Sequence, residues 1–550
     1  PHLYRNDKGR FTDVTAQSGA LAKAAGLAAV AGDFDNDGRP DLFVFGAGAC
    51  ALYRNEGGGR FGDATAAAKI PTYANLSRSA AFVDYDHDGD LDLFVAGLAS
   101  GPEPKNAPTA PALGPGIESA SSDGKKVDDV LDLARELPGA SNLLLRNSGD
   151  GTFADVTAQA KVAGGGHAAA VVPTDYDNRR DVDLLVVNHG APPALYRNLR
   201  DGTFRDVAAE VGLDVKDDFN AAAAGDFNKD GFTDFYFAAR DSPGLFAASD
   251  GRGRFKTSRA PAGLEGATAA QFIDYDDDGL LDLVAVSAKG LRVLRNAGDG
   301  WVDAGSAAAR GLASSRVSPR AFASADIDGD GDTDILARGD AGELKLLRNE
   351  GGSRNTTLRV RLAGKVSNRG GVEAKIEMRA GSLRQKLETY SATPAPAPSD
   401  IVFGLGGRPA ADAVRVIWPS GVVQAETELT QARASTSTLN VEELDRKPSS
   451  CPYLYTWNGE RFEFVTDFMG GGEMGAWAGP GQYNMPDPDE YVRISGEQLR
   501  EKDGRYELRV TNELEEVLFV DRLQLLAVSH PSGVEVFPNE GLGNPTGPDF

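Results

Sequence analysis

The sequence feature that most constrains the fold is a nine-residue acidic pattern that recurs along the chain. It reads DFDNDGRPD at residues 33–41, with aspartates at its first, third, fifth and ninth positions and a glycine at the sixth. Related segments start at Asp84, Asp175, Asp226, Asp274 and Asp326, and the starts lie 48–52 residues apart except for one gap of 91. A period near 50 residues indicates a chain built from repeated structural units.

Carboxylates at alternate positions of a turn indicate a bound cation, because without one they repel each other. Calcium prefers about six to eight oxygen ligands, and D-x-D-x-D-G resembles the first half of an EF-hand loop. The closing acid here precedes a strand-like apolar run, LFVFG, in place of the EF-hand helix. We therefore interpret each segment as a calcium loop inside a β-hairpin. The predicted ligands are Asp33, Asp35, Asp37, Asp41, Asp84, Asp86, Asp88, Asp92, Asp226, Asn228, Asp230, Asp234, Asp274, Asp276, Asp278, Asp282, Asp326, Asp328, Asp330 and Asp334.

A second short motif accompanies most of the acidic loops. LYRN, LLRN or VLRN begins at residues 52, 195, 293 and 346, about 20 residues after the first aspartate, and at residue 144, where the insertion lengthens the spacing. It degenerates to LFAAS at residue 245. With the turn signals between them, each repeat reads as four short antiparallel strands. Four strands per repeat are typical of one blade of a β-propeller.

These residues resemble the FG-GAP or VCBS-type repeats, propeller units that bind calcium in D-x-D-x-D-G hairpins. Farther along, FGLGG at residues 403–407 and VRVIWPSGVVQ at residues 414–424 look like the ASPIC/UnbV domain that follows such repeats in cartilage acidic protein and many bacterial secreted proteins. The resemblance implies an all-β chain with a seven-bladed calcium-binding β-propeller at residues 1–350. An ASPIC/UnbV-like domain at 351–447 and a third domain of unknown role at 448–550 would follow, both resembling β-sandwiches.

Two irregularities affect the expected number of blades and ions. LYRN at residue 3 has no hairpin before it, so we expect a first hairpin upstream of residue 1 and seven blades with the first incomplete. The third hairpin, DYDNRRDVD, keeps Asp175, Asp177 and Asp183 but has Arg179 at the third-carboxylate position and Arg180 in place of the glycine. We predict that Arg179 neutralises this cluster and that about five Ca²⁺ ions bind elsewhere. Alternatively, both arginines face solvent and calcium still binds weakly.

Composition limits the classes of binding partner and the cellular compartment that fit the chain. The net charge of −24 argues against nucleic acid, and no apolar run is long enough to span a membrane. The two cysteines, Cys50 and Cys451, are too few for a disulfide framework, and whether they pair is left open. Calcium loops of this kind favour an extracellular, cell-surface or periplasmic location.

No catalytic arrangement is visible in the sequence. The five histidines form no constellation, and neither G-x-S-x-G nor H-E-x-x-H occurs. We therefore expect a non-enzymatic recognition, adhesion or assembly module that binds a protein or a polysaccharide. The alternative is an extracellular lyase or glycosidase, since a pair of catalytic carboxylates is recognised only in three dimensions.

Two further segments carry local predictions. Residues 98–141 read as an insertion, with a Pro- and Ala-rich linker followed by a helix over KKVDDVLDLAREL at residues 125–137. This helix either packs on the propeller or docks a partner. In the last domain, YLYTWNGERFEF at residues 453–464 predicts a hairpin around Asn458-Gly459.

Overall fold

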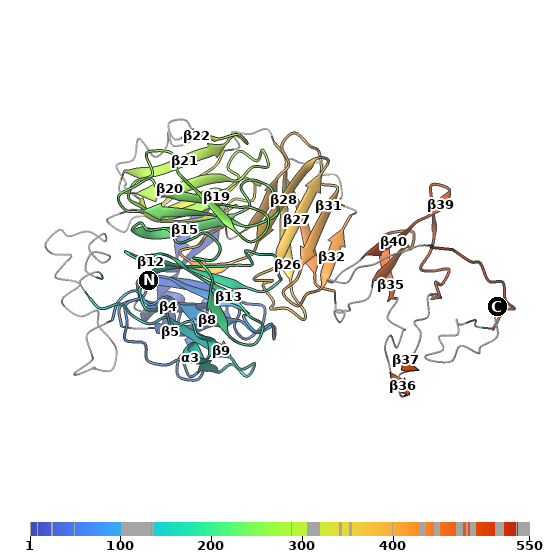
Figure 1. Cartoon of the computed structure of the whole chain (residues 1–550), viewed down its shortest axis with the longest axis horizontal. Coiled ribbons are helices and arrows are strands. Elements are labelled where there is room, and N and C mark those ends of the chain that lie inside the picture. Colours follow the sequence, from blue (N-terminus) through green and yellow to red (C-terminus); the bar gives the residue numbers. More distant parts are fainter. Residues whose placement is uncertain are drawn as a thin grey trace. The chain divides into compact units, whose positions relative to one another are not determined.

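A computed structural model divides the chain into two compact units, residues 1–445 and 446–550 (Figure 1). The structure describes residues 2–7, 9–23, 26–48, 50–100, 134, 137–287, 289–304, 319–339, 344–350, 355–398, 400–427, 429, 436–444, 452–468, 477–479, 482–483, 491–511, 522–534 and 536. Cys451 and most of the predicted helix at 125–137 lie outside this range. Ala134 is buried beside Leu98, and no described helix is long and apolar enough to cross a membrane.

Each acidic segment forms a hairpin between the first two strands of a small antiparallel sheet, as predicted. The ninth residue of each segment opens the second strand. Four strands follow one another in order in most of these sheets. Their strands are β3 (Ala28–Gly32), β4 (Asp41–Phe45), β5 (Cys50–Gly57), β6 (Arg60–Asp63), β7 (Ala80–Val83), β8 (Asp92–Val95), β9 (Leu143–Asn147), β10 (Phe153–Asp155), β11 (His167–Thr174), β12 (Asp183–His189), β13 (Ala194–Asn198), β14 (Phe204–Asp206), β15 (Phe219–Gly225), β16 (Asp234–Ala239), β17 (Leu245–Ser249), β18 (Phe255–Arg259), β19 (Ala267–Ile273), β20 (Asp282–Ser287), β21 (Gly290–Asn296) and β22 (Trp301–Asp303).

The two ends of the repeat region carry smaller sheets in the described residues. The last hairpin belongs to a three-stranded sheet, β23 (Pro319–Ala325), β24 (Asp334–Gly339) and β25 (Leu344–Leu347). The first LYRN motif lies in a two-stranded sheet, β1 (Tyr4–Asp7) and β2 (Arg10–Asp13). Short helical turns are η1 (Thr15–Gln17), η2 (Ala20–Lys23) and α3 (Thr157–Ala160). The all-β propeller-like architecture is confirmed, whereas the count of seven blades stays a prediction.

The repeats pack face to face because their central strands are apolar on both sides. In β16, Phe235 and Phe237 pack toward the preceding sheet, next to Leu185, whereas Tyr236 packs toward the following sheet, next to Phe272. Successive side chains of a strand point to opposite faces, so a continuous apolar run fills both interfaces. The small side chains of β15, FNAAAAG, leave room for these aromatic rings.

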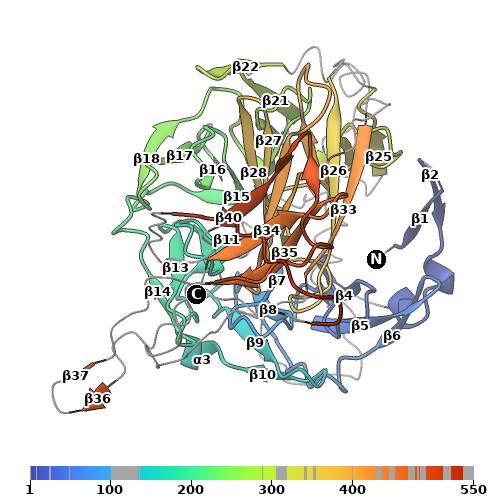
Figure 2. The ribbon, with the colours of Figure 1, turned by 90° about the vertical axis from the view of Figure 1, so that its right-hand side faces the viewer.

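The ASPIC/UnbV-like region forms two sheets over a common core that includes Trp418. It packs against the repeats within the first unit, and Figures 1 and 2 show β27 (Lys375–Ala380) and β28 (Leu383–Glu388) beside the repeat strands. One sheet has the order β30-β26-β33 and the other β28-β27-β31-β32. The strands of this region are β26 (Thr357–Ala363), β27 (Lys375–Ala380), β28 (Leu383–Glu388), β29 (Ser391–Thr393), β30 (Ile401–Gly404), β31 (Ala413–Ile417), β32 (Val423–Glu426) and β33 (Thr436–Glu442).

Strand β29 leaves the ASPIC/UnbV-like sheets and joins a repeat. It pairs antiparallel with β7, so that the second repeat becomes a five-stranded sheet. Thr393 Oγ1 donates to the carbonyl of Ala29 at 2.6 Å, and Gln271 Nε2 donates to the carbonyl of Ala395 at 2.9 Å. The segment therefore runs between the inner strands of non-adjacent repeats and ties them together.

The second unit contains the hairpin predicted around Asn458-Gly459. Strands β34 (Tyr453–Trp457) and β35 (Phe462–Asp467) pair antiparallel, and β40 (Leu508–Thr511) completes the sheet. Asn458 Oδ1 accepts the N–H groups of Glu460 and Arg461 at 2.9 Å, which closes the turn. The remaining described strands are β36 (Trp477–Gly479), β37 (Gln482–Tyr483), β38 (Glu501–Lys502) and β39 (Arg505–Tyr506).

Candidate metal centres

The hairpins bring carboxylates from opposite ends of the acidic pattern together. In five described groups, one oxygen of each of three aspartates lies within 4.8 Å of the others. Most groups combine the first, third and ninth positions of the pattern. The groups are Asp33, Asp35 and Asp37; Asp84, Asp86 and Asp92; Asp175, Asp177 and Asp183; Asp274, Asp276 and Asp282; and Asp326, Asp328 and Asp334.

The loop backbone fixes the carboxylate at the first position. Asp33 accepts the N–H of Asp37 at 3.0 Å and that of Gly38 at 2.8 Å, and Asp274 makes the same pair of contacts with Asp278 and Gly279. The sharp turn requires positive φ at the sixth position, where Gly38 has φ 84°. The sequence pattern therefore sets this part of the geometry locally.

The closing carboxylate is held by the LYRN motif, a relationship that sequence reasoning missed. Asp41 Oδ1 accepts the N–H of Asn55 at 2.7 Å, and Asp92 Oδ1 accepts that of Asn147 at 2.7 Å. Ser249 takes the place of Asn in the degenerate LFAAS and still donates to Asp234 at 2.7 Å. The strand carrying LYRN thus orients the ninth residue of its own hairpin, which explains why the two motifs occur together in the repeats.

The arginine of LYRN lies over the acidic loop in several repeats. Arg54 Nε is 2.6 Å from Asp35 Oδ2, and Arg295 Nε is 2.6 Å from Asp276 Oδ2. Their guanidinium groups are partly exposed, so they neutralise the outer side of a cluster whose inner side is buried. Charge-assisted bonds of this type orient the third-position carboxylate.

Several buried carboxylate oxygens lack a hydrogen-bond partner. They are Asp35 Oδ1, Asp84 Oδ1, Asp183 Oδ2 and Asp276 Oδ1. Burial raises the pKa of Asp41 to about 7 and that of Asp282 to about 9, and the carboxylate of Asp274 adds to the rise at Asp282. Buried oxygens without donors are costly unless a cation compensates them. The donor set, all oxygen and rich in charge, fits Ca²⁺.

Not every predicted ligand converges. The fifth-position residues Asp88, Asp278 and Asp330 lie outside the three-oxygen groups of the described residues, and each accepts an N–H two residues ahead, at 3.0, 2.9 and 3.1 Å. The fourth hairpin forms no such group in the described part of the chain. There Asn228 replaces an acid, and its Nδ2 donates to Asp234 Oδ1 at 3.2 Å.

Residues of the ASPIC/UnbV-like region reach the hairpins, which the sequence did not predict. Glu373 Oε1 accepts the N–H of Asp84 at 2.8 Å, Lys375 Nζ contacts Asp175 Oδ2, and Arg359 Nη2 contacts Asp326 Oδ2. Two further contacts are made by Gly406, which donates to the carbonyl of Asp277 at 2.9 Å, and by Arg369, whose N–H donates to Asn36 Oδ1 at 3.1 Å.

The irregular third hairpin keeps its shape without the glycine. Arg180 adopts φ 72° in the glycine position, and its N–H donates to Asp175 Oδ2 at 2.6 Å. Arg179 Nε lies 3.2 Å from Asp177 Oδ2, but 63% of the Arg179 side chain is exposed. Arg179 thus contacts the aspartate cluster only at its exposed side, through Asp177. The cation at the buried side of the cluster is Lys375, which contacts Asp175.

Comparisons with known proteins agree with this architecture. The FG-GAP-like repeat family matches residues 1–44, 33–95, 175–237, 226–285 and 274–337, and the family described as ASPIC and UnbV matches residues 364–446. Cartilage acidic protein 1 of Homo sapiens is 27% identical over 372 residues, covering 62% of this chain and 50% of that protein. The chain thus spans about half the length of this curated relative.

Similarity to solved structures is weak. An Agrocybe aegerita lectin, described as recognising non-reducing terminal N-acetylglucosamine, gives a TM-score of 0.34 at 17% identity and covers 59% of this chain and 80% of its own. A rhamnogalacturonan lyase of Bacillus licheniformis gives a TM-score of 0.28 at 14% identity, with 58% and 71% covered. Scores of this size carry no argument about function.

Proposed function

The chain belongs to the FG-GAP-like repeat proteins that carry an ASPIC and UnbV domain, and on this basis we propose that it is a calcium-stabilised recognition or assembly module. It binds a protein or a polysaccharide and works outside the cell, at the cell surface or in the periplasm. Calcium is available there at concentrations that suit loops of moderate affinity.

The observation that carries the proposal is the set of aspartate groups, each with a buried first-position residue, whose oxygens converge within 4.8 Å. Each group includes aspartates held by backbone N–H donors, and four oxygens of these groups have no hydrogen-bond partner. A calcium ion would use those oxygens and offset the repulsion between the carboxylates. Ions bound there would stabilise the hairpins.

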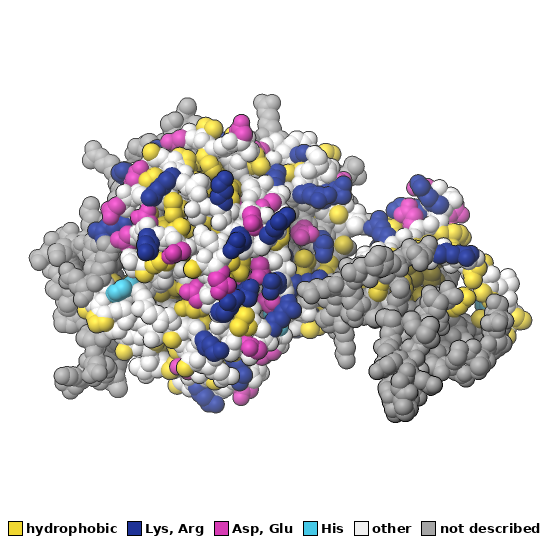
Figure 3. Space-filling model, in the orientation of Figure 1, with side chains coloured by type: hydrophobic (Ala, Val, Ile, Leu, Met, Phe, Trp, Pro, Cys, Tyr) yellow, Lys and Arg dark blue, Asp and Glu magenta, His cyan; other side chains and the backbone are white. Residues whose placement is uncertain are grey.

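Contacts from the ASPIC/UnbV-like region support this structural role for the ions. Glu373, Arg359 and Gly406 touch three different hairpins, so this side of the repeats is covered by the same chain. A macromolecular ligand would therefore bind at another surface. Figure 3 shows acidic and basic side chains interspersed on one face of the molecule, without a continuous basic patch.

Binding is proposed in preference to catalysis. Polar residues between the repeats and β27 and β28, among them the buried Lys375 and Glu388 and the half-buried Glu373 and Tyr390, line a cavity of about 30 Å³. That volume accommodates one or two water molecules but no sugar ring. A polysaccharide lyase or glycosidase, the alternative function, needs two carboxylates in an open cleft.

Two measurements on the full chain test the proposal. Thermal unfolding is recorded in 2 mM EDTA and in 2 mM CaCl₂, and ligands are sought on a glycan array and by affinity capture under both conditions. We expect a higher melting temperature in calcium and calcium-dependent retention of a specific protein or glycan. Superimposable melting curves would contradict calcium stabilisation, and turnover of a polysaccharide by the purified chain would replace recognition with catalysis.

A further inference from the structure

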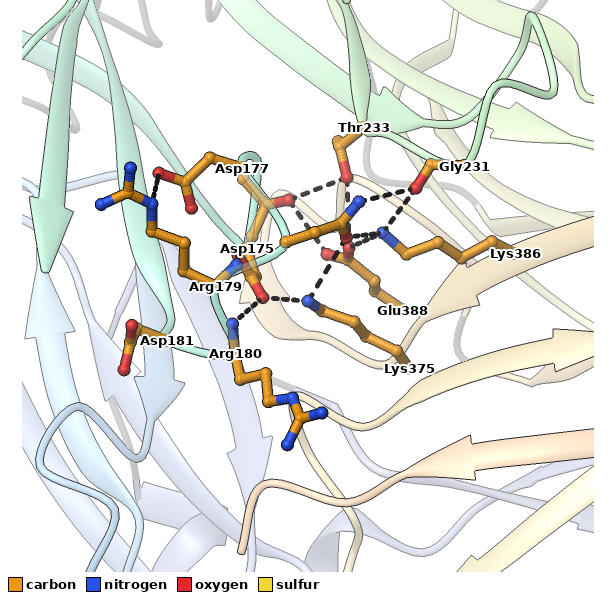
Figure 4. Close-up of polar contacts among 12 residues, drawn as sticks. Asp175, Asp177, Arg179, Arg180, Asp181, Gly231, Thr233, Lys375, Lys386 and Glu388 are labelled. Carbon is orange, nitrogen blue, oxygen red and sulfur yellow. Dashed lines mark hydrogen bonds and ion pairs between the residues drawn. The ribbon is translucent and has the colours of Figure 1, made fainter. Parts of the chain in front are cut away.

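The third hairpin combines an incomplete acidic loop with a buried lysine that the ASPIC/UnbV-like region presents to it. Three of its four aspartates, Asp175, Asp177 and Asp183, still bring oxygens within 4.8 Å of one another. The side chain of Asp175 is 5% exposed, and that of Lys375, whose Nζ contacts Asp175 Oδ2, is 6% exposed. A buried ammonium group therefore lies directly against the first-position carboxylate (Figure 4).

Lys375 and the nearby Lys386 have different partners. Lys386 Nζ is 3.2 Å from Glu388 Oε1, 2.6 Å from Asn178 Oδ1 and 3.2 Å from the carbonyl of Gly231. Its charge is thus compensated by an acid of its own strand, β28. Lys375, on β27, forms an ion pair with Asp175 of the third repeat. Its Nζ also lies 3.5 Å from Asn178 Oδ1. A buried charge requires a partner of opposite sign, so this pair commits Asp175 to the ammonium.

At the second hairpin, which starts at Asp84, the ASPIC/UnbV-like region presents an acid and not a lysine. This acid is Glu373, two residues before Lys375 in the chain. Glu373 accepts the N–H of Asp84 at 2.8 Å, and its Oε2 is buried without a hydrogen-bond partner. That hairpin has the complete D-x-D-x-D-G pattern. The region thus places an acid beside the complete second loop and a lysine beside the third loop, which lacks the third acid and the glycine. At the last loop, which is complete, it places Arg359 against Asp326.

We propose that the Lys375 ammonium is the resident cation of the third hairpin, so that this hairpin joins the ASPIC/UnbV-like region to the repeats without a metal ion. Asp175 accepts the N–H groups of Arg179 at 2.9 Å and Arg180 at 2.6 Å, as Asp33 and Asp274 do in their loops, and in addition its Oδ2 contacts Lys375. A divalent ion at this place would repel the ammonium at short range. Metal binding and the Lys375 contact therefore exclude each other. The inference rests on the proposed calcium binding of the other hairpins.

Removing the ammonium should create a metal site. Without Lys375, the group of Asp175, Asp177 and Asp183 would keep its geometry, and the buried Asp183 Oδ2, which has no hydrogen-bond partner, would be available to an ion. Bound calcium is counted per full-length chain by equilibrium dialysis and elemental analysis. We expect Lys375→Met to bind one ion more than the wild type, and Lys375→Arg to bind the same number as the wild type. Lys386→Met is the matched control, since it removes a buried ammonium while leaving the Lys375–Asp175 pair intact, and it should not change the count.

Folding of the variants is followed at the same time. Lys375→Met should melt at a lower temperature than the wild type in EDTA and recover in calcium by a larger increment. If Lys375→Met does not fold, the single variant Asp183→Asn tests the proposal, because it changes a carboxylate of the third hairpin while Lys375 is kept. The same number of bound ions as in the wild type supports the proposal, and the loss of one ion overturns it. An equal count in folded Lys375→Met and wild type also overturns it. A wild-type chain that binds no calcium would instead contradict the proposed function, so the two failures are distinguishable.

Discussion

Asn6 donates a hydrogen bond of 2.8 Å through Nδ2 to the backbone carbonyl of Ile327, although 321 residues separate them. The same contact links successive repeats: Asn147 donates to the carbonyl of Phe34 at 2.8 Å, and Asn198 to that of Tyr85 at 2.8 Å. Asn147 and Asn198 each reach the second residue of the acidic loop of the preceding repeat, and Asn6 reaches the second residue of the last acidic loop. The first LYRN motif therefore makes the same hydrogen bond to the last hairpin that Asn147 and Asn198 make to the hairpin of the preceding repeat.

The first prediction concerns this contact between repeats. Replacing Asn147 with Ala should lower the free energy of unfolding by about 3 kcal/mol, because the buried carbonyls of Phe34 and Leu91 would lose their donor. The backbone N–H of residue 147 would still hold Asp92. Denaturant unfolding at saturating calcium measures the change.

Asn55 provides the matched control. Its backbone N–H holds Asp41 in the same way, but its Nδ2 donates to Pro40 of its own hairpin at 2.9 Å, at an exposed site. Asn55→Ala should therefore cost about 1 kcal/mol or less. Equal losses for the two variants would show that contact between repeats is not the role of the buried asparagine.

The hairpins and their approximate ligands could be predicted from the sequence because the relevant contacts are local. Asp33 and Gly38 lie within one turn, and the turn type follows from the residues in it. The role of Asn147 could not be predicted, since its partner Phe34 is 113 residues away. Lys375 was missed for the same reason, because its partner Asp175 lies 200 residues away and only the fold brings them together.

The prediction for Arg179 shows that contacts with residues far away in the sequence cannot be inferred from the repeat pattern. Sequence reasoning correctly recognised that the third hairpin has a cation in place of an acid. The side chain in that position is nevertheless long and lies at the rim, where 63% of it is exposed. The buried position belongs to a lysine from another sheet, which no spacing within the repeat could indicate.

The second prediction concerns Gly404 in FGLGG, where the ASPIC/UnbV-like region meets the fifth hairpin. A Cβ at residue 404 would lie 2.2 Å from Asp274 Oδ2 and 2.5 Å from the Cα of Asp277. Gly404→Ala should lower the free energy of unfolding by about 3 kcal/mol, because backbone atoms must move to relieve the overlap. Gly407→Ala is the control, since a Cβ there meets nothing within 4 Å. Similar stabilities of the two variants would contradict the close approach.

The third prediction concerns Glu443, whose carboxylate accepts the N–H groups of Lys365, Val366 and Ser367 and the hydroxyls of Ser367 and Ser420, at 2.6–2.9 Å. Burial acts to raise its pKa, but these hydrogen bonds outweigh it and the pKa lies below its usual range. The folded pKa is therefore below the unfolded one, so the charged form stabilises the fold near neutral pH and this contribution is lost as the pH falls below about 4.5.

Glu443→Gln should accordingly destabilise the chain by about 2 kcal/mol at pH 7, with a smaller difference from the wild type near pH 4. Taking the difference at each pH removes the titration of the calcium ligands, which both proteins share. Glu442→Gln should change little at either pH, since Glu442 is 68% exposed and pairs with Lys365 at 3.0 Å. A constant Glu443→Gln effect between pH 7 and pH 4 would contradict the role of its charge.

The central claim is that the acidic hairpins hold calcium, and counting the ions tests it most directly. The full-length chain is stripped with EDTA, dialysed against 1 mM calcium and assayed for bound metal per chain. The account predicts about five ions: four in the converging groups other than that of the third hairpin, and one in the fourth hairpin, which keeps Asp226, Asp230 and Asp234. At a hundredfold excess over the dissociation constant each ion stabilises the fold by about 2.7 kcal/mol. A chain that retains its fold and binds no calcium above background would contradict the account and would leave the aspartate clusters as turns neutralised by arginine and lysine alone.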